Sequence, residues 1–114
     1  MKETVIKRPT INAMISSKQK TAYLNMEGLE QKVFEGDSNV VAVLTSALEA
    51  IKCSPDNAVV TIQHAEPVVQ SILTGRFSPD SPKLRALVKS LHYAVRKGME
   101  VNVQIRAKVE PLGI

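Results

Sequence analysis

The sequence contains very little of several residue types, and each scarcity argues against a class of protein. Cys53 is the only cysteine, so no disulfide can form within the chain. There is no tryptophan, and two tyrosines and two phenylalanines are too few for a surface that stacks several bases. No apolar run approaches the length of a membrane span, and residues 1–8 lack the apolar centre of a secretion signal. The expected location is therefore the cytoplasm, with no membrane partner.

What the chain does contain is an ordinary globular composition. Its 114 residues, 44% hydrophobic and 23% charged, suit one domain with its own core. Residues 1–9 are mostly polar or charged, which predicts a flexible N-terminal segment followed by a single domain over residues 10–114. The net charge of +4 is compatible with nucleic acid or an acidic protein as partner, although many proteins without such partners carry as much.

The first third of the chain has the pattern of short strands. Residues 11–15, 21–26 and 29–34 form three runs with apolar and β-branched positions, and polar or glycine-containing turns separate them. Three such runs in succession predict an antiparallel meander.

A helical period follows the third run. Asp37 or Ser38 can cap a helix whose apolar residues recur at helical spacing as far as Ile51, and residues 54–57 then break it. Residues 58–62 are short, β-branched and nearly all apolar, which predicts a strand buried on both faces of a sheet.

The last third of the chain contains two more helices and a strand. Pro67 and Pro82 suit the first turns of helices, because the N–H that proline lacks would have no partner there. Gly75 and Gly98 can end these helices in a left-handed conformation. Residues 100–106 then alternate between apolar and polar side chains, as in a strand.

The predicted order βββαβααβ resembles that of the ribonuclease H-like fold over about residues 10–108. Two segments add to the resemblance: residues 36–51 look like that family's lead-in and first helix, and residues 60–70 look like its fourth strand and the helix after it. The resemblance implies an α/β fold with a five-stranded mixed sheet and with helices packed on the sheet.

The same resemblance implies chemistry that this sequence does not support. The family's nucleases hold two divalent ions with carboxylates from the first strand, the first helix, the end of the fourth strand and a late helix. Here the first three positions fall at Ser16, about Val40 and His64, and the fourth has no counterpart. Glu66 and Asp37 are the nearest acids, and both suit helix starts better. We therefore interpret the chain as a degenerate member that lacks the catalytic carboxylates, with no catalytic residue, metal or cofactor.

Several residues are candidates for binding nucleic acid or another partner. His64 would lie at the edge where open α/β sheets bind ligands, or it is simply a polar residue that leads into a helix. A hydrolase built on Ser16 and His64 would lack a recognisable orienting acid. The basic candidates form a phosphate-binding surface if they gather on one side, and otherwise a solvated helix face. All the candidates are Lys18, Lys20, His64, Arg76, Lys83, Arg85, Lys89, Arg96, Lys97 and Arg106.

The sequence thus favours a non-catalytic binding or regulatory module. Its target would be nucleic acid or a nucleic-acid-processing protein, and stripped-down enzyme folds of this kind suggest a phage or mobile-element origin by analogy. A second hypothesis is a structural protein that forms a homodimer through the last helix or a sheet edge, since residues 101–105 could form or adjoin an unprotected edge. The third is a nuclease with rearranged metal ligands.

Overall fold

The computed structural model describes residues 8–106 and 108–113. They form nine elements in the order βββαβααββ. The strands are β1 (Thr10–Lys18), β2 (Thr21–Met26), β3 (Lys32–Glu35), β4 (Val59–His64), β5 (Glu100–Ile105) and β6 (Lys108–Pro111). The helices are α1 (Asn39–Cys53), α2 (Pro67–Leu73) and α3 (Pro82–Ala94).

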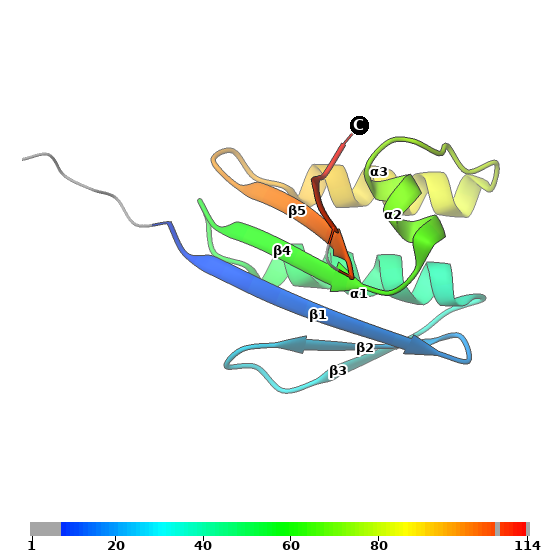
Figure 1. The fold of residues 1–114 in the computed structure, drawn as a ribbon, viewed down its shortest axis with the longest axis horizontal. Coiled ribbons are helices and arrows are strands. Elements are labelled where there is room, and N and C mark those ends of the chain that lie inside the picture. The colour runs from blue at the N-terminus through cyan, green and yellow to red at the C-terminus, as the bar shows by residue number, and fades with distance from the viewer. Residues whose placement is uncertain (1–7, 107, 114) are drawn as a thin grey trace, which may run out of the picture.

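The strands form one mixed sheet in the order β3-β2-β1-β4-β5-β6 (Figure 1). The meander β1–β3 is antiparallel, as the sequence predicts, whereas β4 and β5 run parallel to β1. The prediction of a five-stranded sheet is wrong, because the sheet has six strands. Beyond Arg106, whose φ is 55°, the chain returns as β6 and pairs antiparallel with β5. Residues 101–105 therefore do not form a sheet edge, although they lie beside one.

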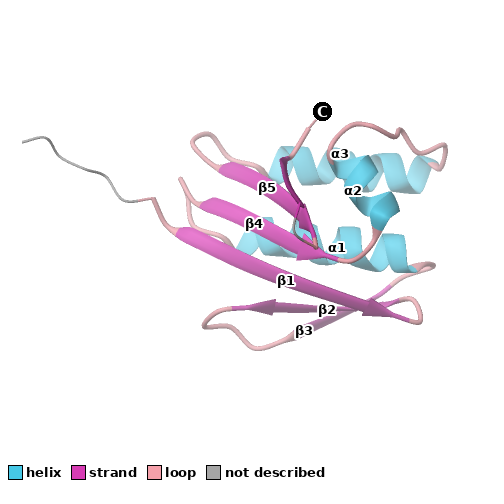
Figure 2. Ribbon diagram, viewed as in Figure 1, coloured by secondary structure: helices cyan, strands magenta, loops and turns pink. Residues whose placement is uncertain are grey.

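All three helices lie on one side of the sheet (Figure 2). The connections from β1 to β4 and from β4 to β5 step across the sheet in the same direction, so the right-handed preference of such crossovers places their helices on the same face. Side chains on the other face remain at least partly exposed. In β4, for example, Val59, Thr61 and Gln63 are half-buried while the alternate residues are buried. The prediction that this strand is buried on both faces is therefore wrong.

Helix α1 is the element around which the core forms. Of the two predicted caps, Asp37 and Ser38, it is Ser38 that caps the helix: its hydroxyl accepts a hydrogen bond from the N–H of Val41 at 3.2 Å. Small residues let the helix approach the sheet closely, and Ala42, Ala47 and Ala50 are fully buried between larger core residues.

The helix α3 departs from the expectation that the helices pack directly on the sheet. It packs mainly against α1, and only Leu91 among its residues is buried. A hollow of about 340 Å³, lined in part by Val95, Met99 and Leu112, lies between its C-terminal end and the last strands. Its apolar stripe is consequently only partly covered.

Element ends differ modestly from the sequence pattern. Strand β1 continues to Lys18, past the predicted stop at residue 15, because polar side chains on the uncovered face do not interrupt the ladder. Strand β3 begins only at Lys32, and Leu29 lies in the preceding turn. Of the predicted flexible segment 1–9, residues 1–7 lie outside the described residues. Pro9 accepts a backbone hydrogen bond from Val59 at 2.8 Å.

In the described part of the chain, no helix has the length and apolarity to cross a membrane.

Candidate functional site

The candidate site is the edge of the sheet where the parallel strands β1, β4 and β5 end. Two hydrogen-bonded links bring the starts of α1 and α3 to this edge. Asn39, at the start of α1, accepts a bond from the backbone N–H of Lys20 at 2.6 Å, and Lys83, at the start of α3, pairs with Asp37 at 2.5 Å. We call this region the carboxyl edge. In open α/β sheets it is the usual place for a ligand.

The three positions expected to have lost their carboxylates do not converge on one point. Ser16 points to the uncovered face and is exposed, Val40 is half-buried in the first turn of α1, and His64 is buried against the helices. The neighbour Ser17 faces the helix side instead, and its hydroxyl donates to Glu66 Oε1 at 2.7 Å. Adjacent residues of a strand point to opposite faces, so Ser16 and Ser17 cannot serve the same site.

Four acids of the described chain lie near the carboxyl edge, and one of them, Glu35, ends β3 opposite Thr21. Glu66 is held by Ser17, Asp37 by Lys83, and Glu110 by Arg76. Within residues 8–106 and 108–113, no three His, Cys, Asp or Glu side chains come close enough to hold a metal ion together. Hard divalent cations such as Mg²⁺ prefer clusters of oxygen ligands, which these separated acids do not supply.

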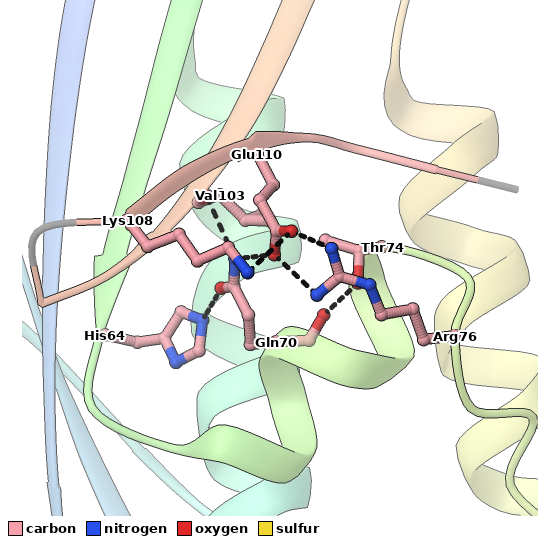
Figure 3. A network of polar contacts seen from close by, with 7 residues as sticks. All are labelled: His64, Gln70, Thr74, Arg76, Val103, Lys108 and Glu110. Carbon is pink, nitrogen blue, oxygen red and sulfur yellow. Dashed lines mark hydrogen bonds and ion pairs between the residues drawn. The ribbon is translucent and has the colours of Figure 1, made fainter.

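His64 belongs to a buried polar network at this edge (Figure 3). Its Nδ1 accepts a hydrogen bond from the Glu66 N–H at 3.1 Å, so Nε2 carries the proton and donates to Gln70 Oε1 at 2.8 Å. Both ring nitrogens are thus engaged, and only 5% of the residue is exposed. His64 also lines a hollow together with Arg106, but with both nitrogens engaged it offers no free donor or acceptor to a ligand there.

Gln70 connects His64 to the last two strands. Its side-chain amide donates to the Val103 carbonyl at 3.2 Å and to Glu110 Oε2 at 2.9 Å. Glu110 also accepts from Arg76 and pairs with Lys108 at 3.5 Å (Figure 3). The hydrogen bond from Gln70 and then the Arg76 guanidinium hold the pKa of the Glu110 carboxyl below its usual value, against the opposing effect of burial. The candidate Arg76 therefore has a structural partner within the protein.

Burial lowers the pKa of His64 below 6.5, outweighing the opposite effects of Gln70 and Glu66. His64 therefore takes up a proton more readily in the unfolded chain than in the folded one. Its contribution to the free energy of unfolding is fully present above pH ~6.5 and is lost as the pH drops toward the folded pKa. We expect urea midpoints to decrease from pH ~7.5 to ~5.5 in the wild type.

The variant His64→Gln, which keeps an N–H donor toward Gln70 but cannot titrate, should lose less of its midpoint over the same pH interval. Equal decreases in the two proteins would assign the pH dependence to other groups.

The remaining candidates at the carboxyl edge are exposed cations. Lys18 and Lys20 lie at the β1–β2 turn, and Arg106 lies at the β5–β6 turn. Arg106 borders a hollow of about 320 Å³ that Met14, Ser16, Asn25 and Gln63 also line. None of these three cations forms an ion pair with a described residue. They are available to a partner.

The other four basic candidates lie away from this cluster. Arg85 and Lys89 point outward from α3. Arg96 pairs with Asp56 at 2.7 Å and donates to the Ser54 carbonyl, so it ties the end of α3 to the end of α1. Lys97 is exposed in the turn before β5, at the opposite end of the sheet. The ten candidates therefore do not form a single surface.

Sequence reasoning missed Gln70, Glu110 and the amide side chains around Arg106. Gln70 interrupts the otherwise apolar buried side of α2, which was a usable signal for a buried polar contact. Glu110 lies 40 residues away along the chain, and no local pattern connects it with Gln70.

Comparisons with known proteins agree with the predicted fold. No family model matches the chain, and no curated protein matches its sequence. Among solved structures, it is similar to ribonuclease H1 from the halophilic archaeon Halobacterium salinarum NRC-1, with a TM-score of 0.56 and 12% identity. The match covers 85% of this chain and 86% of that one. At this identity the likeness concerns the fold, and on that basis the chain has a ribonuclease H-like fold.

Proposed function

We propose that this protein is a non-catalytic ribonuclease H-like domain that binds nucleic acid at its carboxyl edge. The observation that carries the proposal is the character of that edge, where Lys18, Lys20 and Arg106 are exposed and have no described acidic partner. Unpaired cations at the ligand-binding edge of an α/β sheet suit phosphates. The ribonuclease H1 with the same fold acts as a precedent for nucleic acid as the target.

The arrangement of the acidic residues at the carboxyl edge supports the non-catalytic part of the proposal. Cleavage of a phosphodiester by two metal ions requires several carboxylates around one point. At the carboxyl edge, Glu66 is bonded to Ser17, and the position at the end of β4 is occupied by the buried His64. A domain of this kind would occupy or present nucleic acid and so regulate other proteins that act on it.

Self-assembly through a sheet edge receives less support. The edge strands β3 and β6 have four residues each, which offers a short ladder to a second copy. Strand β3 begins with Lys32 and ends with Glu35, and β6 contains Lys108 and Pro111. Charged residues and proline discourage pairing between edges. Light scattering at two protein concentrations should therefore give the monomer mass.

The test of nucleic-acid binding is a gel-shift series with single-stranded DNA, duplex DNA and an RNA–DNA hybrid, from ~50 mM salt upward. We expect the double variant Lys20→Glu/Arg106→Glu to bind at least ~10-fold more weakly, and its salt slope to fall by about 2 with duplex DNA, because two phosphate contacts are lost.

The matched control is Lys52→Glu/Lys97→Glu, which changes the net charge equally at the opposite end of the sheet. It should lose much less affinity. Equal losses in the two double variants, or no binding by the wild type at ~50 mM salt, would contradict the proposed site.

Catalysis is tested separately with the RNA–DNA hybrid and Mn²⁺. No cleavage above background is expected. Mn²⁺-dependent cleavage that disappears in a Glu66→Gln variant would overturn the non-catalytic assignment, because it would make Glu66 part of a metal site.

A further inference from the structure

A second surface lies on the helix side of the molecule, where the loop after α2 passes between α2 and α3. Phe77 in this loop is 51% exposed. Its position is nevertheless fixed, because the backbone N–H groups of Arg76 and Phe77 both donate to the Ser71 carbonyl, at 2.9 and 3.1 Å. An exposed aromatic side chain on an anchored backbone is typical of contact surfaces between proteins.

Phe77 separates two shallow hollows. One, of about 340 Å³, lies between the end of α2 and the outer side of α3, and Ile72 and Val88 supply apolar walls. The other, of about 280 Å³, lies beside the start of α2 and is lined by Pro67, Val68 and Ser71. Val68 is 50% exposed. The two hollows together form an apolar surface with two places for side chains, one on each side of the aromatic ring.

The charges around the first hollow are all positive. Arg85 and Lys89 lie one helical turn apart on α3 and line its rim, and no acidic residue of the described chain lines either hollow. Neither cation forms an ion pair with a described residue. Lys89 lies 5.9 Å above the ring of Tyr93, which is itself exposed. An occupant of this surface would therefore meet apolar side chains and unpaired positive charge.

We propose that this surface, formed by Val68, Ser71, Phe77, Arg85, Val88 and Lys89, docks an acidic amphipathic segment of a partner protein. Two apolar side chains of the segment would enter the hollows on either side of Phe77, and its carboxylates would pair with Arg85 and Lys89. A peptide fits better than a small molecule. Small-molecule sites enclose most of their ligand, whereas these hollows are open and are separated by the Phe77 ring.

This surface shares no residue with the proposed nucleic-acid site. It involves the candidates Arg85 and Lys89, whereas that site consists of Lys18, Lys20 and Arg106. A protein that holds nucleic acid at one edge and a partner's acidic segment at another surface would bring that partner to the nucleic acid.

The test uses a fluorescein-labelled helical peptide with two leucines four residues apart and glutamates on the flanking turns. Fluorescence anisotropy at ~50 mM salt should show saturable binding. We expect Phe77→Ser to weaken it about tenfold, because one wall of both hollows is lost. Arg85→Glu/Lys89→Glu should weaken it at least as much, and a peptide with lysines in place of the glutamates should not bind.

Matched controls separate local effects from general ones. Leu29→Ser removes an equally exposed apolar side chain elsewhere, and Lys52→Glu/Lys97→Glu changes the net charge equally; both should bind the peptide like the wild type. Circular dichroism confirms that each variant is folded. In ¹⁵N–¹H spectra, the peptide should shift the amide signals of Val68, Phe77 and Lys89.

Three results would overturn the proposal, and the first two are no saturable binding at millimolar peptide and binding that is unchanged in both surface variants. Peptide binding that is lost instead in Lys20→Glu/Arg106→Glu, with shifts at the β1–β2 turn, would also overturn it, because the peptide would then be acting as a polyanion at the carboxyl edge. Failure of nucleic acid to bind would leave these outcomes unaffected, so the two proposals can be tested separately.

Discussion

Replacing Gln70 by leucine is expected to lower the free energy of unfolding by about 3 kcal/mol. The leucine fills a similar volume but can neither accept the bond from His64 Nε2 nor donate to the Val103 carbonyl. Both partners lie in the buried part of the carboxyl edge, where water cannot easily replace a lost hydrogen bond. Urea unfolding at pH ~7.5, with His64 neutral, measures the effect.

The matched control for this prediction is Gln63→Leu. Gln63 is the same residue type on β4, but it faces the uncovered side of the sheet and is half-buried. Its replacement should change stability by less than ~0.5 kcal/mol. A Gln70→Leu variant as stable as Gln63→Leu would show that water or neighbouring side chains satisfy His64 and Val103, and the network would then contribute little to the fold.

The variant Glu110→Gln tests the other end of the same network. It retains an acceptor for Gln70 but removes the charge that pairs with Arg76. Because the pKa of Glu110 is lowered in the fold, its contribution to stability is present above the unfolded pKa and is lost as the pH falls through the folded one. As the pH falls through the folded pKa of Glu110, the free energy of unfolding should therefore decrease less steeply in Glu110→Gln than in the wild type.

Local signals in the sequence located most elements. Ser38, one of the two predicted caps, caps α1, and Pro67 and Pro82 lie in the first turns of their helices as predicted. These features depend on a few neighbouring residues, so a single sequence contains the information needed to predict them.

Features that depend on distant contacts were predicted less well. Strand β6 is four residues long, contains a proline and has only one buried residue, Glu110, so its composition does not indicate a strand. It forms because the left-handed turn at Arg106 returns the chain alongside β5. The uncovered face of β4 was missed for a related reason: Val59 and Thr61 are β-branched and suit either a buried or an exposed position in a sheet.

The candidate site shows the same division. The sequence shows which residue types occupy the expected positions, but it does not show which way their side chains point. Ser16 and Ser17 are adjacent, yet only Ser17 faces Glu66. Ten candidate residues along the chain looked like one possible surface. Three-dimensional placement separates them into the carboxyl edge, the outer side of α3, residues engaged in internal contacts, and Lys97 at the opposite end of the sheet. The hypothesis of two distinct binding surfaces depends on that separation.

Truncating Leu91 to alanine should lower the free energy of unfolding by about 3 kcal/mol and should act most strongly on α3. Leu91 is the only buried residue of this helix, and α3 packs mainly against α1, with the hollow beside Val95 and Met99 separating its end from the sheet. We therefore expect the α3 amides to exchange with solvent through a local opening of lower free energy than that of the β1 amides.

In the Leu91→Ala variant, native-state hydrogen exchange should show the protection of the α3 amides reduced about 100-fold. Leu84→Ala, in the same helix but half-buried, is the control and should reduce it less. The affinity for the acidic peptide should fall with the population of folded α3, because Arg85 and Lys89 keep their spacing only in the helix. Nucleic-acid binding at the carboxyl edge should change little, since Lys18, Lys20 and Arg106 lie outside α3. Equal exchange free energies for α3 and β1 in the wild type would instead make α3 part of one cooperative unit, and the two binding activities would then be lost together.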